Sequence, residues 1–259
     1  MKLTDKQESV IDRWLSAVET GKPDGDYGNV TVLHDNPSGG PQLTYGKHQT
    51  TEAGRNLQSM VSAYLARDSS FLTGPEKAKL KEFVEARPYT KVRDTTLKAV
   101  LRKAGGDPAM QDVQNEFFLE HYMKPARQWA VFNGFKLPLS MLVIYDSFIQ
   151  SGSVPWWLRK RFREAPPSQG GDEKKWVSQY VDVRHQWLKY WGDGTSRKSK
   201  AIRNSSYRTT ALNFETDRGN WDLSMCPMKV NGIIVVGGTP TEPKNVTCPT
   251  CGGTGTIPS

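Results

Sequence analysis

The chain changes hydrophobic period once near its N-terminus, and this change constrains the fold more than any other feature. Apolar side chains recur at three- and four-residue spacing within residues 10–18, which is typical of one face of an α-helix. Thr4 and Gln7 have the spacing of a helix-capping box, and Gly21 supplies a C-terminal stop. Residues 30–45 then alternate with a period of two around a loop rich in Asn, Pro and Gly. We therefore expect a helix that ends at Gly21 and leads into a β-hairpin.

The rest of the chain is predicted to be mostly helical. Residues from 51 onward carry helical apolar patterns that are interrupted by Gly and Pro. Long helices are expected over residues 108–132, with a kink at Pro125, over residues 139–150 and over residues 174–191. From residue 223 onward Gly, Pro and Thr dominate, which predicts an extension with little core of its own. We therefore predict an α+β, mostly α-helical fold, with one domain over residues 1–222 and a C-terminal extension over residues 223–259.

Positive charge is concentrated in the second part of the chain. Residues 1–150 hold 19 Lys and Arg against 18 Asp and Glu, whereas residues 151–259 hold 16 against 9. A basic surface of this kind attracts a polyanion, which can be nucleic acid, anionic lipid headgroups or a carboxylate-bearing cell-wall polymer; a solvated basic face without a partner is the alternative. We expect no nucleic-acid partner, because the sequence carries no base-reading motif. We expect no membrane insertion either, because the most apolar stretch, residues 137–149, is short and contains Asp146.

The N-terminal residues and the cysteines bear on where the protein acts. The first residues carry no apolar export segment, so we expect synthesis in the cytoplasm and action on a cell wall after release. Three cysteines in 259 residues do not make a disulfide scaffold. Cys248 and Cys251 form one Cys-x-x-Cys knuckle, but with Cys226 they supply only three of the four ligands of a structural zinc site. We therefore predict no metal and no cofactor, with these three cysteines as the only candidates for a metal.

Two carboxylates near the predicted hairpin suggest glycosidic chemistry. Glu19 lies at the edge of the apolar face of the first helix, where partial burial raises the pKa of a carboxyl. Asp35 lies in the polar hairpin loop and is expected to stay ionised. Glycosidic hydrolysis needs this combination of a proton donor and an ionised carboxylate. We therefore predict Glu19 as the acid, Asp35 as the base and Thr44 as the residue that orients the attacking water. The alternative is that the two carboxylates only end a helix and form a turn.

Glu19, Asp35 and Thr44 together resemble the catalytic hairpin of the lysozyme superfamily, and most closely that of the family-46 chitosanases. Three further segments resemble this family in the same order: residues 110–126 its long central helix, residues 140–152 its Tyr-Asp…Gly helix, and residues 180–184 with 204–208 its two arginine segments. The resemblance covers residues 8–215. It implies a lysozyme-like fold of two lobes, with a small β-hairpin or sheet beside the active-site cleft. It also implies an inverting mechanism, with the two carboxyl groups about 6.5–9.5 Å apart.

The resemblance further implies a buried charge network behind Glu19, formed by Asp146, Arg184 and Arg208. An Asp within an apolar run is costly unless it is paired, and Arg can pair with it through two hydrogen bonds. The network would hold Glu19 in place and tune its acidity; an ion pair that only stabilises the fold is the alternative. Asp26 is the rival for the second carboxylate, but it precedes the first strand, so the hairpin-loop carboxylate is preferred.

The residues after the hairpin depart from the family pattern. Tyr45, His48 and Arg55 are the expected substrate contacts, and a loose alignment puts Arg55 near an Asp that the family uses to hold a sugar ammonium. Glu52 is an alternative for that role, and His48 is alternatively a surface residue that does not contact sugar. Lys47, with His48 and Arg55, would repel protonated glucosamine and suit a carboxylate-bearing peptidoglycan.

We therefore predict a glycoside hydrolase that cleaves β-1,4-glycosidic bonds of an amino-sugar polymer by an inverting two-carboxylate mechanism. Peptidoglycan is the preferred substrate, as for a lysozyme-like phage endolysin that degrades the cell wall and lyses bacteria. Chitosan is the first alternative, and a non-catalytic protein that binds the cell wall or a polyanion is the second. The polysaccharide is the only partner that we expect, and we expect a monomer.

Overall fold

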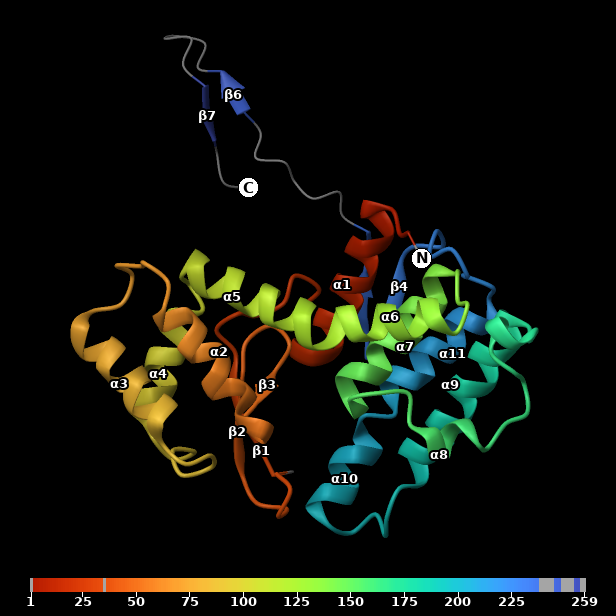
Figure 1. The fold of residues 1–259 in the computed structure, drawn as a ribbon, viewed down its shortest axis with the longest axis horizontal. Coiled ribbons are helices and arrows are strands. Elements are labelled where there is room, and N and C mark those ends of the chain that lie inside the picture. The colour runs from red at the N-terminus through yellow and green to blue at the C-terminus, as the bar shows by residue number, and fades with distance from the viewer. Residues whose placement is uncertain (1, 35, 238–244, 248–253, 257–259) are drawn as a thin grey trace.

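The computed structural model describes residues 2–34, 36–237, 245–247 and 254–256, which form a mostly helical protein with small sheets (Figure 1). The helices are α1 (Asp5–Thr20), α2 (Asn56–Leu65), α3 (Gly74–Glu85), α4 (Thr95–Ala104), α5 (Pro108–Phe118), α6 (Lys124–Phe132), α7 (Pro138–Ser151), α8 (Trp156–Arg159), α9 (Glu173–Tyr190), α10 (Arg197–Asn204) and α11 (Tyr207–Asp217). Between them lie two 3-10 turns, η1 (Ala53–Arg55) and η3 (Pro167–Gln169), and a π-helix, η2 (Leu119–Met123). The strands are β1 (Val30–Leu33), β2 (Gln42–Tyr45), β3 (Thr50–Thr51), β4 (Met228–Val230), β5 (Ile233–Val235), β6 (Asn245–Thr247) and β7 (Thr254–Thr256).

Helix α1 begins and ends where the sequence predicts. The Thr4 hydroxyl accepts a hydrogen bond from the Gln7 N–H, and the Gln7 side chain accepts one from the Thr4 N–H, so the capping box is present. Gly21 follows the helix with φ of 74°, in the left-handed region that glycine adopts without strain. The chain then forms the predicted hairpin, in which β1 pairs antiparallel with β2, and β3 adds a third strand beside β2.

The three-stranded sheet, helices α2–α4 and the first part of α5 form a small lobe (orange and yellow in Figure 1). Its core is a cluster of buried side chains that includes Leu43 from the sheet, Leu57 from α2 and Phe83 from α3. All four residues of β2 are buried. The returning strand of the hairpin is therefore enclosed on both faces, and the groove face of the sheet is supplied mainly by β1.

Helices α1 and α6–α11 form a large lobe with its own core (green and blue in Figure 1, with α1 in red). Its centre is α7, in which every residue of 139–148 is buried. The β4–β5 hairpin packs against α1 and α11, and Met228 and Val235 are fully buried in the same cluster. The segment from residue 223, for which we expected little core, therefore contributes to the core of the large lobe as far as Val235. The remaining described strands, β6 and β7, pair with each other.

A continuous helical connection of α5, η2 and α6 joins the two lobes (Figure 1). We expected one helix over residues 108–132 with a kink at Pro125, and this expectation is corrected. Pro125 has no N–H to donate, and its ring excludes the carbonyl four residues earlier. The chain accommodates this by a π-turn in which the Lys124 N–H bonds the carbonyl of Leu119, five residues back. None of the described helices is long and apolar enough to cross a bilayer.

Candidate active site

A groove of about 610 Å³ lies between the two lobes. The small lobe lines it with residues of the sheet and its turns, including Thr31, His34 and Gln49; the large lobe contributes Glu19, Trp187 and Arg208, among others. Its volume is within the range of ordinary ligand sites, about 300–1,000 Å³. The structure therefore places the predicted acid in an open groove where a chain-like ligand can pass.

Glu19 occupies the last turn of α1, which carries its carboxyl to the lobe boundary. Its side chain is 16% exposed, and its Oε1 accepts a hydrogen bond of 2.8 Å from Nη2 of Arg208. Burial raises the pKa of Glu19, and the charge and hydrogen bond of Arg208 oppose this rise without cancelling it. The carboxyl therefore keeps its proton to a higher pH than an exposed glutamate does.

Asp146 is fully buried in α7 and holds two arginines around it. Its Oδ1 accepts hydrogen bonds from Nη2 and Nε of Arg208, at 2.7 and 2.9 Å, and its Oδ2 accepts one of 2.6 Å from Nη1 of Arg184. Burial alone would raise the pKa of Asp146, but the guanidinium groups of Arg208 and Arg184 hold it below its ordinary value. Asp146 is therefore an ionised carboxylate that fixes Arg208 against Glu19.

Thr44 lies in the middle of β2 and is fully buried. Its hydroxyl lies 2.5 Å from that of Thr31 and donates a 2.6 Å hydrogen bond to Oε1 of Gln49. Thr31 and Gln49 both line the groove, whereas Thr44 stands behind them. The hydroxyl of Thr44 is thus placed to set the orientation of these two groove residues, while Thr44 itself does not line the groove.

The second carboxylate of the prediction, Asp35, lies outside the described residues, and so does its separation from Glu19. The residue before it, His34, lines the groove, so the hairpin reaches the groove at this point. Its rival Asp26 precedes β1, accepts a hydrogen bond from the Gly28 N–H and forms a 2.7 Å ion pair with Lys22. Asp26 does not line the groove.

Tyr45 and His48 do not reach the groove, and both expected sugar contacts are corrected. The ring of Tyr45 is fully buried in the small-lobe core, because both faces of β2 are covered. The ring of His48 is buried against Phe118, with ring centroids 3.4 Å apart, in a separate cavity lined also by Asp12 and Lys47. Burial lowers the pKa of His48 well below its ordinary value, and the Lys47 charge adds to this, so the imidazole is neutral.

The other residues after the hairpin also take structural positions. Nζ of Lys47 lies 2.7 Å from Oδ2 of Asp12, which neutralises it. Arg55 is exposed and donates a 2.6 Å hydrogen bond to the carbonyl of Val84, outside the groove lining. Glu52, considered as an alternative sugar contact, is fully buried and accepts hydrogen bonds from the N–H groups of Leu43 and Tyr89. The alternative that Glu52 contacts the substrate is therefore wrong, and Glu52 instead ties β2 to the loop before α4.

Several groove residues were not singled out from the sequence, among them Trp187, His34 and Lys198. Trp187 lies three residues after Arg184 on α9, and this spacing places the two on one face of the helix, so a signal for it was present. Its ring meets Trp157 edge to face, at 5.0 Å between centroids, which leaves it fixed at the groove wall. His34 and Lys198 had no such signal, because each lies on a polar segment whose placement depends on how the lobes meet.

The cysteines give no support for a metal site within the described residues. Cys226 is a free, exposed thiol, while Cys248 and Cys251 lie outside the described residues. Among the side chains that the structure describes, no group of three or more His, Cys, Asp or Glu is arranged to hold a metal ion.

The chain matches a known protein-family model. The model described as glycosyl hydrolase family 46 matches residues 78–227. This span contains Asp146, Arg184 and Arg208, while α1 and the β1–β2 hairpin precede it.

Individual relatives extend the similarity over most of the chain. A chitosanase of Bacillus subtilis (strain 168) is 25% identical over 237 residues, which cover 86% of this chain and 81% of the relative. The solved structure of a family-46 chitosanase from Gynuella sunshinyii in complex with chitotetraose superposes with a TM-score of 0.76 and 22% identity, covering 91% of this chain and 98% of that one. Native chitosanase from Bacillus subtilis MY002 gives a TM-score of 0.72 and 22% identity, covering 90% and 100%. The lysozyme-like fold predicted from the sequence is thereby confirmed.

Proposed function

Because this chain belongs to glycosyl hydrolase family 46, we propose that it is a chitosanase, which hydrolyses β-1,4 bonds of chitosan with inversion at the anomeric carbon. Its class, glycoside hydrolase, follows from the family. The preference for peptidoglycan, with the endolysin role attached to it, finds no support among the relatives. Chitosan, the first alternative, is better supported, because the relatives on both sequence and structure are named as chitosanases.

One observation carries the proposal for the site: a partly buried carboxyl with a raised pKa stands in the groove and is held by a buried charge network. A general acid must be protonated before the reaction and aimed at the leaving oxygen. Burial supplies the first property of Glu19, and the hydrogen bond from Arg208 supplies the second. We assign Glu19 as the acid, and Asp146, Arg184 and Arg208 as positioning residues.

The proposed reaction is a single displacement. Glu19 donates its proton to the glycosidic oxygen as the bond from that oxygen to the anomeric carbon breaks. A water attacks the same carbon from the opposite face, and its proton passes to Asp35, the proposed base. The product carboxylate of Glu19 is stabilised by Arg208 until solvent returns its proton.

The case for peptidoglycan had rested on cations beside the hairpin, and their positions weaken it. Lys47 is paired with Asp12, His48 is buried and neutral, and Arg55 bonds backbone carbonyls outside the groove lining. None of the three stands where it would repel a glucosamine unit next to Glu19. Arg208, which does line the groove, contacts the ionised carboxylate of Asp146 as well as the carboxyl of Glu19, and Lys198 lines the groove as a second cation.

The experiment is a reducing-end assay of the purified protein on chitosan and on murein in parallel, with Glu19→Gln as the matched variant. We expect release from chitosan, a loss of about 10²–10⁴-fold in the variant, and no release from murein. Release of reducing ends from murein alone would refute chitosan as the substrate. Equal rates of the parent and Glu19→Gln would refute Glu19 as the general acid.

The base is tested separately by comparing two Asp→Asn variants. Asp35→Asn is expected to abolish turnover, while Asp26→Asn is expected to retain it. The reverse result would transfer the role of base to Asp26. Proton NMR of the first product formed gives the anomer, which is α if the reaction inverts the β bond.

A further inference from the structure

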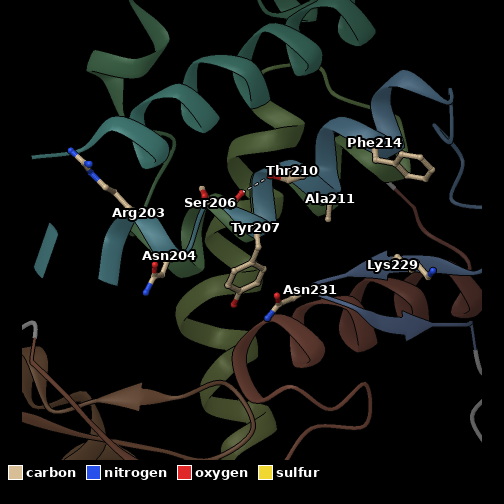
Figure 2. A pocket seen from close by; sticks show the side chains of 9 residues that line it. All are labelled: Arg203, Asn204, Ser206, Tyr207, Thr210, Ala211, Phe214, Lys229 and Asn231. Atoms are coloured by element: carbon tan, nitrogen blue, oxygen red, sulfur yellow. Dashed lines mark hydrogen bonds between the residues drawn. The ribbon is translucent and has the colours of Figure 1, made fainter. Parts of the chain in front are cut away.

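A second hollow, of about 670 Å³, adjoins the catalytic groove on the large lobe. It lies between α11 and the β4–β5 hairpin, as Figure 2 shows. Asn204 and Tyr207 line both this hollow and the groove. The two hollows are therefore neighbours, with Asn204 and Tyr207 between them.

One face of α11 forms the floor of this hollow. Tyr207, Thr210, Ala211 and Phe214 follow one another at helical spacing of three, one and three residues, which places them on one face of the helix. Two aromatic rings thus stand about 10 Å apart along the helix axis, with two small side chains between them. This spacing leaves a shallow trough bounded by an aromatic ring at each end.

Both rings are held in place by their surroundings. The Tyr207 hydroxyl donates a 2.8 Å hydrogen bond to the carbonyl of Val18, in the last turn of α1. Phe214 is 57% exposed, and the guanidinium of Arg218 lies 5.2 Å from its ring centroid. Arg218 is in turn anchored by an ion pair of 2.6 Å with buried Glu215. An exposed ring that is fixed in this way is suited to packing on a ligand face, because little side-chain entropy is lost on binding.

The polar groups of the hollow indicate the chemistry of its ligand. Of the nine described residues that line it, none carries a carboxylate, while Lys229 and Arg203 carry positive charge. The Arg203 side chain is engaged with the carbonyls of Trp191 and Gly192, which leaves Lys229 and the amides of Asn204 and Asn231 toward a ligand. A protonated glucosamine unit would face this cation without any counter-charge. An N-acetylated unit brings no charge, and it offers an amide to the asparagines and a methyl group to Ala211 and Phe214.

We infer that the hollow is an accessory binding site for N-acetylated units of the polymer whose glucosamine bonds are cleaved in the groove. The inference rests on the proposed function, since it takes an amino-sugar chain as the ligand. The site adjoins the catalytic groove, and its charge selects the acetylated units of the chain.

The test is a titration of ¹⁵N-labelled Glu19→Gln protein with the tetramer of N-acetylglucosamine and, separately, with the tetramer of glucosamine. Amide shifts of Thr210, Ala211 and Asn231 report the hollow, and those of His34 and Gln49 report the groove. We expect the hollow to bind the acetylated tetramer at least about tenfold more tightly than the glucosamine tetramer. Adding Phe214→Ala should weaken that binding about tenfold, while Phe132→Ala, which removes an 84% exposed ring on α6, should leave it unchanged.

A charge reversal at Lys229 gives a second, independent readout. In Lys229→Glu the preference of the hollow should shift toward the glucosamine tetramer, since a carboxylate then faces the ammonium groups. Thermal unfolding of each variant checks that the fold is retained.

The inference would be overturned if the two tetramers gave equal amide shifts in the hollow, or if Phe214→Ala left binding of the acetylated tetramer unchanged. It would also be overturned if the parent self-associated and Phe214→Ala abolished this self-association. Hydrolysis of chitosan is assayed on the unmutated protein. If the protein hydrolyses chitosan but the amides of the hollow do not shift, the accessory site alone is refuted. If those amides shift but chitosan is not hydrolysed, the proposed function alone is refuted.

Discussion

Nη2 of Arg208 lies 2.8 Å from Oε1 of Glu19, and the same nitrogen lies 2.7 Å from Oδ1 of Asp146. One guanidinium nitrogen thus links a carboxyl in the groove to a carboxylate in the core of the large lobe. Because Asp146 and Arg208 are almost without solvent, their charges are poorly screened. Beyond its own burial, the acidity of Glu19 therefore depends on Arg208 and, through Arg208, on Asp146, which does not line the groove.

Removing the charge of Arg208 should raise the pKa of Glu19 further. Burial already raises this pKa, Arg208 opposes the rise, and Asp146 adds to it. In Arg208→Gln the opposing charge is gone, so the alkaline limb of kcat/KM on chitosan should move to higher pH. The pH profile of kcat/KM measures this shift, together with a loss of kcat because Glu19 is less well held.

The matched control is Arg127→Gln, which removes a partly exposed arginine paired with Glu8. Its alkaline limb should coincide with that of the parent. If the alkaline limb of Arg208→Gln stays in place or moves to lower pH, Glu19 is not the acid whose pKa is tuned by its contact with Arg208.

Replacing Asp146 should destabilise the fold strongly. Asp146→Asn leaves Arg184 and Arg208 buried without their shared carboxylate, and breaking a buried ion pair in this way costs about 3–5 kcal/mol. The folded-state pKa of Asp146 is below its unfolded value, so its contribution to stability is present above about pH 4 and is lost as the pH falls through the folded-state pKa. Urea unfolding of parent and variant at several pH values should show the stability difference narrowing in acid.

Asp24→Asn is the comparison for a surface ion pair. Asp24 is largely exposed and pairs with Arg13, so its loss should change the free energy of unfolding by less than about 1 kcal/mol. Similar losses in Asp146→Asn and Asp24→Asn would mean that the buried network contributes nothing beyond a surface contact.

The local parts of this architecture could be predicted from the sequence because each depends on neighbouring residues. The cap at Thr4, the stop at Gly21 and the hairpin follow from spacing and turn chemistry within a few positions. The pairing of Asp146 with arginine was predictable for another reason, since a carboxylate in an apolar helix has few stable alternatives.

What the sequence could not supply is how segments from different lobes meet. We expected Tyr45 to contact sugar, yet β2 is covered on both faces and buries it. His48 and Lys47 follow directly but turn to α5 and α1 instead of the groove. The π-turn before Pro125 was missed because a proline predicts a disrupted helix without saying how the chain accommodates it.

Trp187 should contribute to substrate binding more than to the chemical step. It lines the groove on α9, and a fixed aromatic ring packs against the apolar face of a sugar. Trp187→Ala should raise KM for chitosan oligomers about tenfold, equivalent to about 1.4 kcal/mol, with a smaller change in kcat. Trp156→Ala removes a ring that is 66% exposed outside the groove lining, and it should leave KM unchanged. Equal effects of the two variants on KM would show that the Trp187 ring does not contribute to substrate binding.

Gly46 should tolerate no side chain, because two costs coincide there. Its φ is +85°, and an added Cβ would lie 2.1 Å from Oε1 of Gln114, which accepts a hydrogen bond from the Lys47 N–H and ties the hairpin to α5. Gly39, in the hairpin loop, has φ of +75° with no atom within 4 Å of an added Cβ. Gly39→Ala should therefore cost only the backbone strain, about 1–2 kcal/mol, whereas Gly46→Ala should cost about 1–3 kcal/mol more through the displaced Gln114. Chemical unfolding of the two variants measures both costs, and equal losses would mean that the contact between Gly46 and Gln114 does not hold the hairpin against the connection between the lobes.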